Sequence, residues 1–186
     1  MKTDPIKIIL EDNFLINKKV YFISGNETTL IENVSRSILE KYQANKNIEV
    51  SKIDTLENFT DETSLFENHK IYLSRNCRGV NENNLNKIIK SNAVFIFIYE
   101  NSQKSKVIKK FLINNNDACV VDCYELDKNS KIRILNKYLE QGNIIIQQDI
   151  FYFLIDKLDN RYAFFEADLK KILDLDQNEI NFKNVT

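Results

Sequence analysis

Residues 21–31, with the sequence YFISGNETTLI, decide the expected fold, because they lead from an apolar run through one glycine into an amphipathic pattern. The apolar run over residues 18–24 predicts a buried strand, and Gly25 predicts the turn that ends it. Over residues 30–42 the apolar side chains recur at spacings of three and four, which indicates a helix with one buried face. A strand that turns directly into a helix is the first part of an α/β unit.

The alternation of strand and helix patterns continues to about residue 126. Further short apolar runs predict strands at residues 48–53, 71–73, 94–99 and 119–124. Helical spacing precedes the last two of these runs, at residues 85–89 and 107–112, with Val107, Ile108, Phe111 and Leu112 on the apolar face of the second helix. This order predicts an α/β domain over residues 1–126, built on a parallel sheet with helices on both faces.

The pattern changes after about residue 126, because the strand runs stop and only helical spacing remains. Three helices are expected, with apolar residues Ile132, Leu135, Tyr138 and Leu139 in the first, Ile150, Phe151, Leu154, Ile155 and Leu158 in the second, and Phe164, Phe165, Leu169, Ile172 and Leu173 in the third. Residues 127–186 are therefore expected to form a small helical domain.

The composition excludes several classes of site and of partner. The chain of 186 residues contains three glycines and one proline, whereas a Walker A loop and a dinucleotide-binding fingerprint each need closely spaced glycines. A formal net charge of −1 argues against a strong binder of nucleic acid or of a membrane surface. The first residues lack the pattern of a signal peptide, and no apolar run reaches the ~18 residues of a membrane span, so the expected compartment is the cytoplasm.

The cysteine and histidine content leaves little material for a metal site or a nucleophilic centre. Cys77, Cys119 and Cys123 make an odd number and have no second ligand pair at the spacing of a zinc site. The single histidine, His69, is not accompanied by a motif for a nucleophile and its base. We therefore expect structural, partly buried thiols, no metal, no cofactor and no catalytic residues.

The turn after the first strand stands where a P-loop would lie, because the N-terminus of the following helix offers free amides and a positive dipole to phosphate. Aligned on Gly25, the second glycine of the motif falls on Leu30, its lysine on Ile31 and its magnesium-binding hydroxyl on Glu32. The residues of this degenerate P-loop are Gly25, Asn26, Glu27, Thr28 and Thr29, with Thr28 or Thr29 expected as the helix N-cap. Glu27 and Glu32 place negative charge where phosphate would lie. An ordinary α/β domain with a capped helix would show the same pattern.

Four segments, taken in their order and spacing, resemble the delta subunit of the bacterial DNA polymerase III clamp loader. They are residues 21–31, the stretch TSLFENHKIYL at 63–73, the strand at 93–100 and the stretch FEADLKKI at 165–172. The resemblance implies an AAA+ fold without a working ATP site, followed by a three-helix lid over residues 127–186. It also implies a third, helical collar domain, which we do not expect in this chain, because the sequence stops at Thr186, about where that domain would begin; the chain is then either a fragment or an unusually short relative. A member of this family is a subunit of a DNA polymerase holoenzyme, a nucleotidyltransferase complex, and has no catalytic site of its own.

The resemblance further implies a binding site for the ring-shaped sliding clamp at Ser64, Leu65 and Phe66. In the family, the Leu-Phe pair projects into a hydrophobic pocket on the clamp, the beta ring, and the subunit helps to open one ring interface. The implied partners are the clamp and the other loader subunits, with DNA contacted mainly through the complex and no membrane. Clamp-binding peptides usually begin with glutamine, whereas the matching position here is Asp61. The alternative is that Leu65 and Phe66 fold back onto the core.

Two other functions stay open on the residues alone. One is a divergent P-loop protein that binds a nucleotide through Thr28 or Thr29, and the other is a stand-alone protein-interaction module unrelated to replication. Four lysines also lie close together, namely Lys104, Lys106, Lys109 and Lys110. We expect them on the solvated face of their helix, with contact to DNA or to an acidic partner as the alternative.

Overall fold

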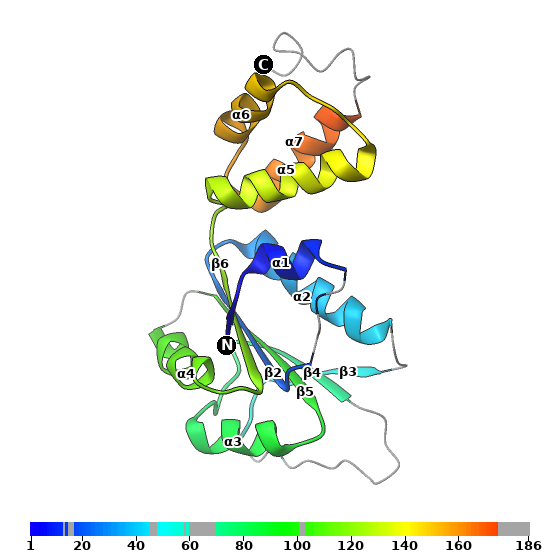
Figure 1. Ribbon diagram of the computed structural model, residues 1–186. Helices are drawn as coiled ribbons and strands as arrows, with labels where there is room; N and C mark the ends of the chain where they lie inside the picture. Colours follow the sequence, from blue (N-terminus) through cyan, green and yellow to red (C-terminus); the bar gives the residue numbers. More distant parts are fainter. Residues whose placement is uncertain are drawn as a thin grey trace. The chain divides into compact units, whose positions relative to one another are not determined.

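The computed structural model describes residues 1–12, 14, 17–44, 48–57, 59, 70–100 and 103–174. The chain divides into two compact units, Met1–Cys123 and Tyr124–Thr186 (Figure 1). Within the described residues, the strands all belong to the first unit, and the second unit is helical.

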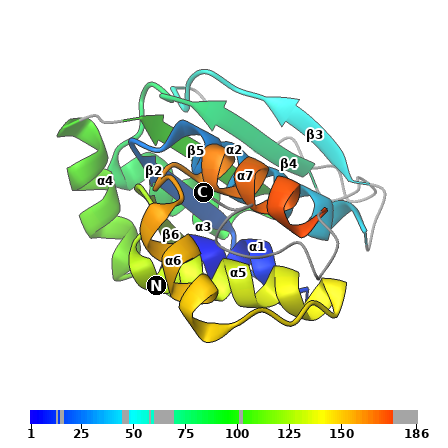
Figure 2. The ribbon, with the colours of Figure 1, turned by 90° about the horizontal axis from the view of Figure 1, so that it is seen from above.

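In the described part of the chain, six parallel strands form one sheet in the order β1-β6-β2-β5-β4-β3. Their bounds are β1 (Lys2–Thr3), β2 (Val20–Gly25), β3 (Glu49–Lys52), β4 (Lys70–Arg75), β5 (Val94–Glu100) and β6 (Ala118–Cys123). β2 lies between β5 and β6, and its last residue, Gly25, is paired with Glu100 on one side and with Cys123 on the other. β3 is the edge strand beside β4 (Figure 2). Because every pair is parallel, the carboxyl ends of the strands lie along one edge of the sheet.

Helices cover both faces of this sheet (Figure 1). On one face lie α1 (Pro5–Leu10) and α2 (Thr28–Gln43), and on the other lie α3 (Glu82–Lys90) and α4 (Gln103–Ile113). The side chains of β2 alternate between these faces: Phe22 belongs to the cluster under α3 and α4, whereas the Tyr21 hydroxyl lies 3.4 Å from the hydroxyl of Tyr42 in α2. The prediction of a parallel sheet with helices on both faces is confirmed.

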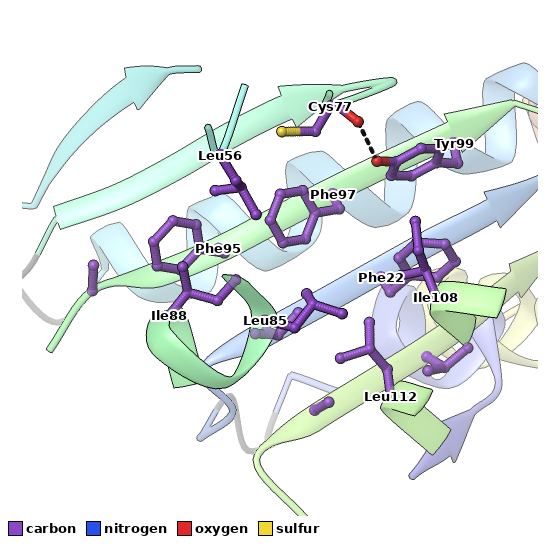
Figure 3. Packing of buried hydrophobic residues seen from close by; sticks show 14 residues of the cluster. Phe22, Leu56, Cys77, Leu85, Ile88, Phe95, Phe97, Tyr99, Ile108 and Leu112 are labelled. Atoms are coloured by element: carbon purple, nitrogen blue, oxygen red, sulfur yellow. Dashed lines mark hydrogen bonds between the residues drawn. The ribbon is translucent and has the colours of Figure 1, made fainter. Parts of the chain in front are cut away.

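A buried cluster fills the space between the sheet and helices α3 and α4 (Figure 3). Its helical members include Leu85, Ile88, Ile108 and Leu112. In the sheet, Phe95 stacks on Phe97 with ring centroids 6.0 Å apart and on Tyr72 at 5.1 Å. Such ring pairs add about 0.5–1.5 kcal/mol to the stabilisation from burial. The Tyr99 hydroxyl donates to the Cys77 carbonyl oxygen at 2.6 Å, so its polar end is satisfied inside the cluster.

The patterns in the sequence do not predict β1 and α1. β1 has two residues and α1 has six, which is too short for a helical or strand period to emerge. The start of α1 is nevertheless specified locally. Pro5 occupies its first turn, and the carboxylate of Asp4 accepts a hydrogen bond from the Ile6 N–H at 2.8 Å.

In the first unit, the predictions of the N-cap of α2 and of the burial of Val107 are wrong. α2 begins at Thr28 and its N-cap is Glu27, so neither Thr28 nor Thr29 caps the helix. The carboxylate of Glu27 accepts a hydrogen bond from the backbone amide of Leu30. Thr28 and Thr29 already lie inside the first turn of the helix, so neither is in the position from which a side chain caps that amide. In α4, Val107 is 69% exposed, although the next residue, Ile108, is buried. The sheet covers only part of the apolar stripe of this helix, and Val107 lies in the part that it leaves open.

The described part of the second unit consists of α5 (Lys128–Gly142), α6 (Gln148–Lys157) and α7 (Tyr162–Leu173). Its buried apolar residues are Leu126, Ile134, Leu135, Ile150, Leu154, Ile155, Tyr162, Phe165 and Leu169. Phe164, which the pattern places in the core, is 52% exposed, and the Arg161 guanidinium lies 4.0 Å from its ring centroid. Lys131 is buried and donates to the carbonyl oxygens of Ile155 and Leu158 at the end of α6. None of the described helices has the length and hydropathy needed to span a bilayer.

Candidate functional site

The turn from β2 into α2 lies at the carboxyl edge of the sheet, where the sequence places a degenerate P-loop. Gly25 ends β2 with φ of 154°, and a Cβ atom at this position would lie 1.8 Å from the carbonyl oxygen of Cys123. That oxygen belongs to the neighbouring strand β6, whose last residue is paired with Gly25. Gly25 is therefore required by the close approach of two backbones, independently of any ligand.

The backbone amides that follow Gly25 are used by the protein itself. The N–H groups of Asn26 and Glu27 both donate to the Cys123 carbonyl oxygen, with N···O distances of 3.1 and 3.2 Å. In a P-loop, the amides of such a turn surround phosphate oxygens. Here the Cys123 carbonyl oxygen takes the place that a phosphate oxygen would have. The amides of Asn26 and Glu27 therefore point toward β6 of the sheet.

The N-terminus of α2 holds a negative charge from its own sequence. The Glu27 side chain is buried and accepts hydrogen bonds from the Leu30 N–H and from the Thr29 hydroxyl, the latter at 2.8 Å. A carboxylate at this position satisfies amides that a helix leaves unpaired and lies at the positive end of the helix dipole. Glu27 thus supplies inside the fold the negative charge that phosphate supplies in a nucleotide-binding loop.

The residues at the three positions that would bind nucleotide and magnesium in a P-loop make structural contacts instead. Leu30 and Ile31, at the positions of the second glycine and the lysine, are buried in the core. Glu32, at the position of the magnesium-binding hydroxyl, forms an ion pair with Arg75 at the end of β4. Arg75 also pairs with Glu100 at the end of β5, at 3.1 Å. These three side chains are between 43% and 45% exposed, so solvent screens each pair and its contribution to stability is small.

A second set of charges surrounds Asp122, the residue before the end of β6. Its carboxylate pairs with Lys109 of α4 and with Lys2, the latter at 3.0 Å, and accepts from the Ser24 hydroxyl at 3.4 Å. Burial acts to raise the pKa of Asp122, but the hydrogen bonds and charges of the two lysines outweigh it and hold this pKa below its ordinary value. Lys109 is therefore committed to an ion pair, contrary to the expected solvated face, whereas Lys106 and Lys110 are exposed.

The described residues contain little that could perform chemistry at this edge. No group of three or more His, Cys, Asp or Glu side chains in the described ranges could hold a metal ion. Cys77, Cys119 and Cys123 are buried, as expected, and burial raises the pKa of each thiol, which disfavours the reactive thiolate. Ser64, Leu65 and Phe66, the residues of the expected clamp-binding site, lie outside the described residues.

The sequence contains no signal for the groups that fill this edge. Arg75 and Glu32 are separated by 43 positions, and both are ordinary charged residues in their own elements. The acceptor of the two loop amides is a backbone carbonyl, which has no sequence signature at all. Only the pairing of β2 with β6 brings that carbonyl to the loop.

Neither a protein-family model nor a curated protein matches the sequence. Solved structures do match the fold. The Bacillus subtilis DNA clamp loader delta protein (YqeN) superposes with a TM-score of 0.53 at 17% sequence identity, covering 83% of this chain and 52% of that chain. AMPPCP-bound DnaA from Aquifex aeolicus superposes with a TM-score of 0.50 at 13% identity, covering 93% of this chain and 61% of that chain.

These similarities define the fold of the chain and no more. The six-stranded parallel sheet with its flanking helices is an AAA+-like α/β fold, as the resemblance in the sequence implies. The chain spans about half to three-fifths of the length of the two solved proteins.

Proposed function

We propose that this chain comprises the AAA+-like domain and the helical lid domain, residues 1–126 and 127–186, of a clamp-loader delta subunit. It binds the sliding clamp and helps to open it during DNA replication, and it does not hydrolyse ATP. Its partners are the clamp and the other loader subunits, and it contacts DNA mainly through the complex. The chain has no catalytic site of its own and acts within a DNA polymerase holoenzyme.

The observation that carries this proposal is the use of the P-loop position by the chain's own groups. Two loop amides donate to the Cys123 carbonyl oxygen, and the Glu27 carboxylate caps the helix where phosphate would lie. An AAA+-like fold whose phosphate ligands are replaced by structural contacts fits a subunit that acts mechanically. The fold similarity to a clamp loader delta protein supports the same assignment. The Leu65-Phe66 pair supplies two adjacent apolar side chains of the kind that anchor a peptide in a pocket.

The assignment of the clamp site is tested by replacing both anchors. We expect the double substitution Leu65→Ala/Phe66→Ala to weaken binding of the full chain to the organism's own sliding clamp by about tenfold or more, because apolar anchors carry most of the binding free energy of such interfaces. Surface plasmon resonance with immobilised clamp measures the Kd. A matched control is Ile145→Ala/Phe164→Ala, which removes an exposed aliphatic and an exposed aromatic side chain from the second unit and should leave the Kd unchanged. Equal affinity of wild type and the Leu65/Phe66 variant, or absence of binding by both, contradicts the assignment.

The absence of ATP binding is tested separately by thermal denaturation. We expect Mg-ATP to leave the Tm unchanged, because a ligand raises the Tm only if it binds the folded state more tightly than the unfolded state. Differential scanning calorimetry over a series of Mg-ATP concentrations measures this, with sodium sulfate at matched ionic strength as the control for anion effects. A Tm that rises with the logarithm of the Mg-ATP concentration, and not with sulfate, would favour the divergent nucleotide-binding protein instead.

A further inference from the structure

A groove lies between α3 and α4, and the loop at residues 76–81 also lines it. It consists of two adjoining hollows of about 700 Å³ and about 770 Å³, which share Glu82, Val107 and Phe111. We call these together the α3–α4 groove. Leu85 of α3 and Ile108 of α4 line the first hollow beside Tyr99 of the sheet (Figure 3). The second hollow adds Asn86 of α3 and continues along α4.

The floor of the α3–α4 groove is apolar and partly open to solvent. Val107 is 69% exposed, whereas Ile108, the next residue of α4, is buried. Phe111 follows Val107 by one helical turn, lines both hollows and is only partly buried. A single exposed valine is ordinary on a protein surface. This one lies in a groove next to a partly open phenylalanine, which is the arrangement that receives an apolar side chain of a partner.

Positive charge flanks this apolar floor. Lys106 and Lys110 lie one turn apart on α4, line the second hollow and are both exposed. Neither forms an ion pair with another residue in the described ranges, in contrast to Lys109, which pairs with Asp122. Among the described residues of the groove, the acidic ones are Glu57, which lines the first hollow together with Arg78, and Glu82, which lines both hollows, so in the second hollow two lysines face one carboxylate. The end of the groove around Lys106 and Lys110 is therefore the positive end.

We propose that the α3–α4 groove binds an amphipathic helix of a partner protein, whose apolar face lies on Val107 and Phe111 and whose acidic side chains contact Lys106 and Lys110. An amphipathic helix is the form of peptide that fits a groove between two helices. Charge complementarity with the two lysines then selects acidic residues on its flank. None of the described residues that line the groove is Ser64, Leu65 or Phe66, and the proposal does not depend on the function proposed above.

Protein is favoured over single-stranded nucleic acid by the chemistry of the groove. Nucleic-acid channels present exposed aromatic rings on which bases stack. In the described part of the chain, two aromatic rings line this groove: Tyr99 is 3% exposed, with its hydroxyl bonded to the Cys77 carbonyl, and only Phe111 is partly open, so successive bases have no series of rings on which to stack.

The test uses the full chain and synthetic peptides of about 16 residues, which form about four helical turns. Three peptides share one leucine face and differ only at their polar positions, which are all glutamate, all glutamine or all lysine. We expect the glutamate peptide to bind with a Kd about tenfold or more below that of the lysine peptide, measured by fluorescence anisotropy. In the variant Lys106→Glu/Lys110→Glu, the preference should reverse, so that the lysine peptide binds more tightly.

The apolar floor is tested in the same assay. Val107→Glu should raise the Kd of the glutamate peptide about tenfold or more, because it places a charge at the anchor position and repels the acidic flank. Val50→Glu is the matched control, since Val50 is an exposed valine on β3, and it should leave the Kd unchanged. Circular dichroism establishes that each variant is folded. The proposal is overturned if no peptide binds below about 1 mM, if Val107→Glu and Val50→Glu behave alike, or if the lysine peptide or a single-stranded oligothymidylate binds the wild type most tightly.

Discussion

Replacing Gly25 with alanine is expected to lower the free energy of unfolding by about 3 kcal/mol or more. The added Cβ would lie 1.8 Å from the Cys123 carbonyl oxygen. Both atoms are fixed by the backbones of two paired strands. No side-chain rotation relieves this contact, so β2 and β6 must move apart. That movement also weakens the hydrogen bonds from Asn26 and Glu27, because they end on the same oxygen. Urea denaturation followed by far-ultraviolet circular dichroism measures the loss.

Gly142→Ala is the matched control for this prediction. Its Cβ would first meet Cδ1 of Ile144 at 2.8 Å, which is the far end of a flexible side chain, and Gly142 lies in the last turn of α5. We expect a change within about 1 kcal/mol, because alanine has a higher helix propensity than glycine and the isoleucine can rotate away. The strain argument fails if Gly25→Ala and Gly142→Ala change the free energy of unfolding equally.

Glu27→Lys is expected to cost about 3–5 kcal/mol of stability, since it leaves a buried charge without a partner. The substitution places a positive charge at the positive end of α2 and removes the acceptor of the Leu30 N–H and the Thr29 hydroxyl. Glu27→Gln keeps an acceptor oxygen of similar reach, so it should cost only about 1 kcal/mol. Thermal and urea denaturation of both variants measure these differences.

Glu32→Lys serves as the exposed counterpart of Glu27→Lys in the same helix. The Glu32 side chain is 45% exposed and its partner Arg75 is 43% exposed, so reversing this charge should cost about 1 kcal/mol or less. If Glu27→Lys is no more destabilising than Glu32→Lys, the carboxylate of Glu27 does not act as the buried anion of this turn.

Much of the first unit could be predicted from local patterns. Strand and helix periods are visible within windows of about 11–18 residues, and β2, β5, β6, α2, α3 and α4 all show them. The parallel direction of the strands also follows from the alternation of strands with helices. β1 and α1 are too short to show a period. The exposure of Val107 and of Phe164 could not be predicted either, because periodicity indicates an apolar stripe and not how much of that stripe a neighbouring element covers.

The candidate site, too, could be predicted only in part from the sequence. The loss of the phosphate ligands is a property of residue types, so Leu30, Ile31 and Glu32 determine it without any structure. What takes the place of those ligands depended on the tertiary structure. The Cys123 carbonyl reaches the Asn26 and Glu27 amides only because β6 pairs with β2, and Arg75 reaches Glu32 only across the sheet from β4. Contacts between segments so distant in the chain depend on the order of the strands in the sheet. That order cannot be inferred from any short window of the sequence.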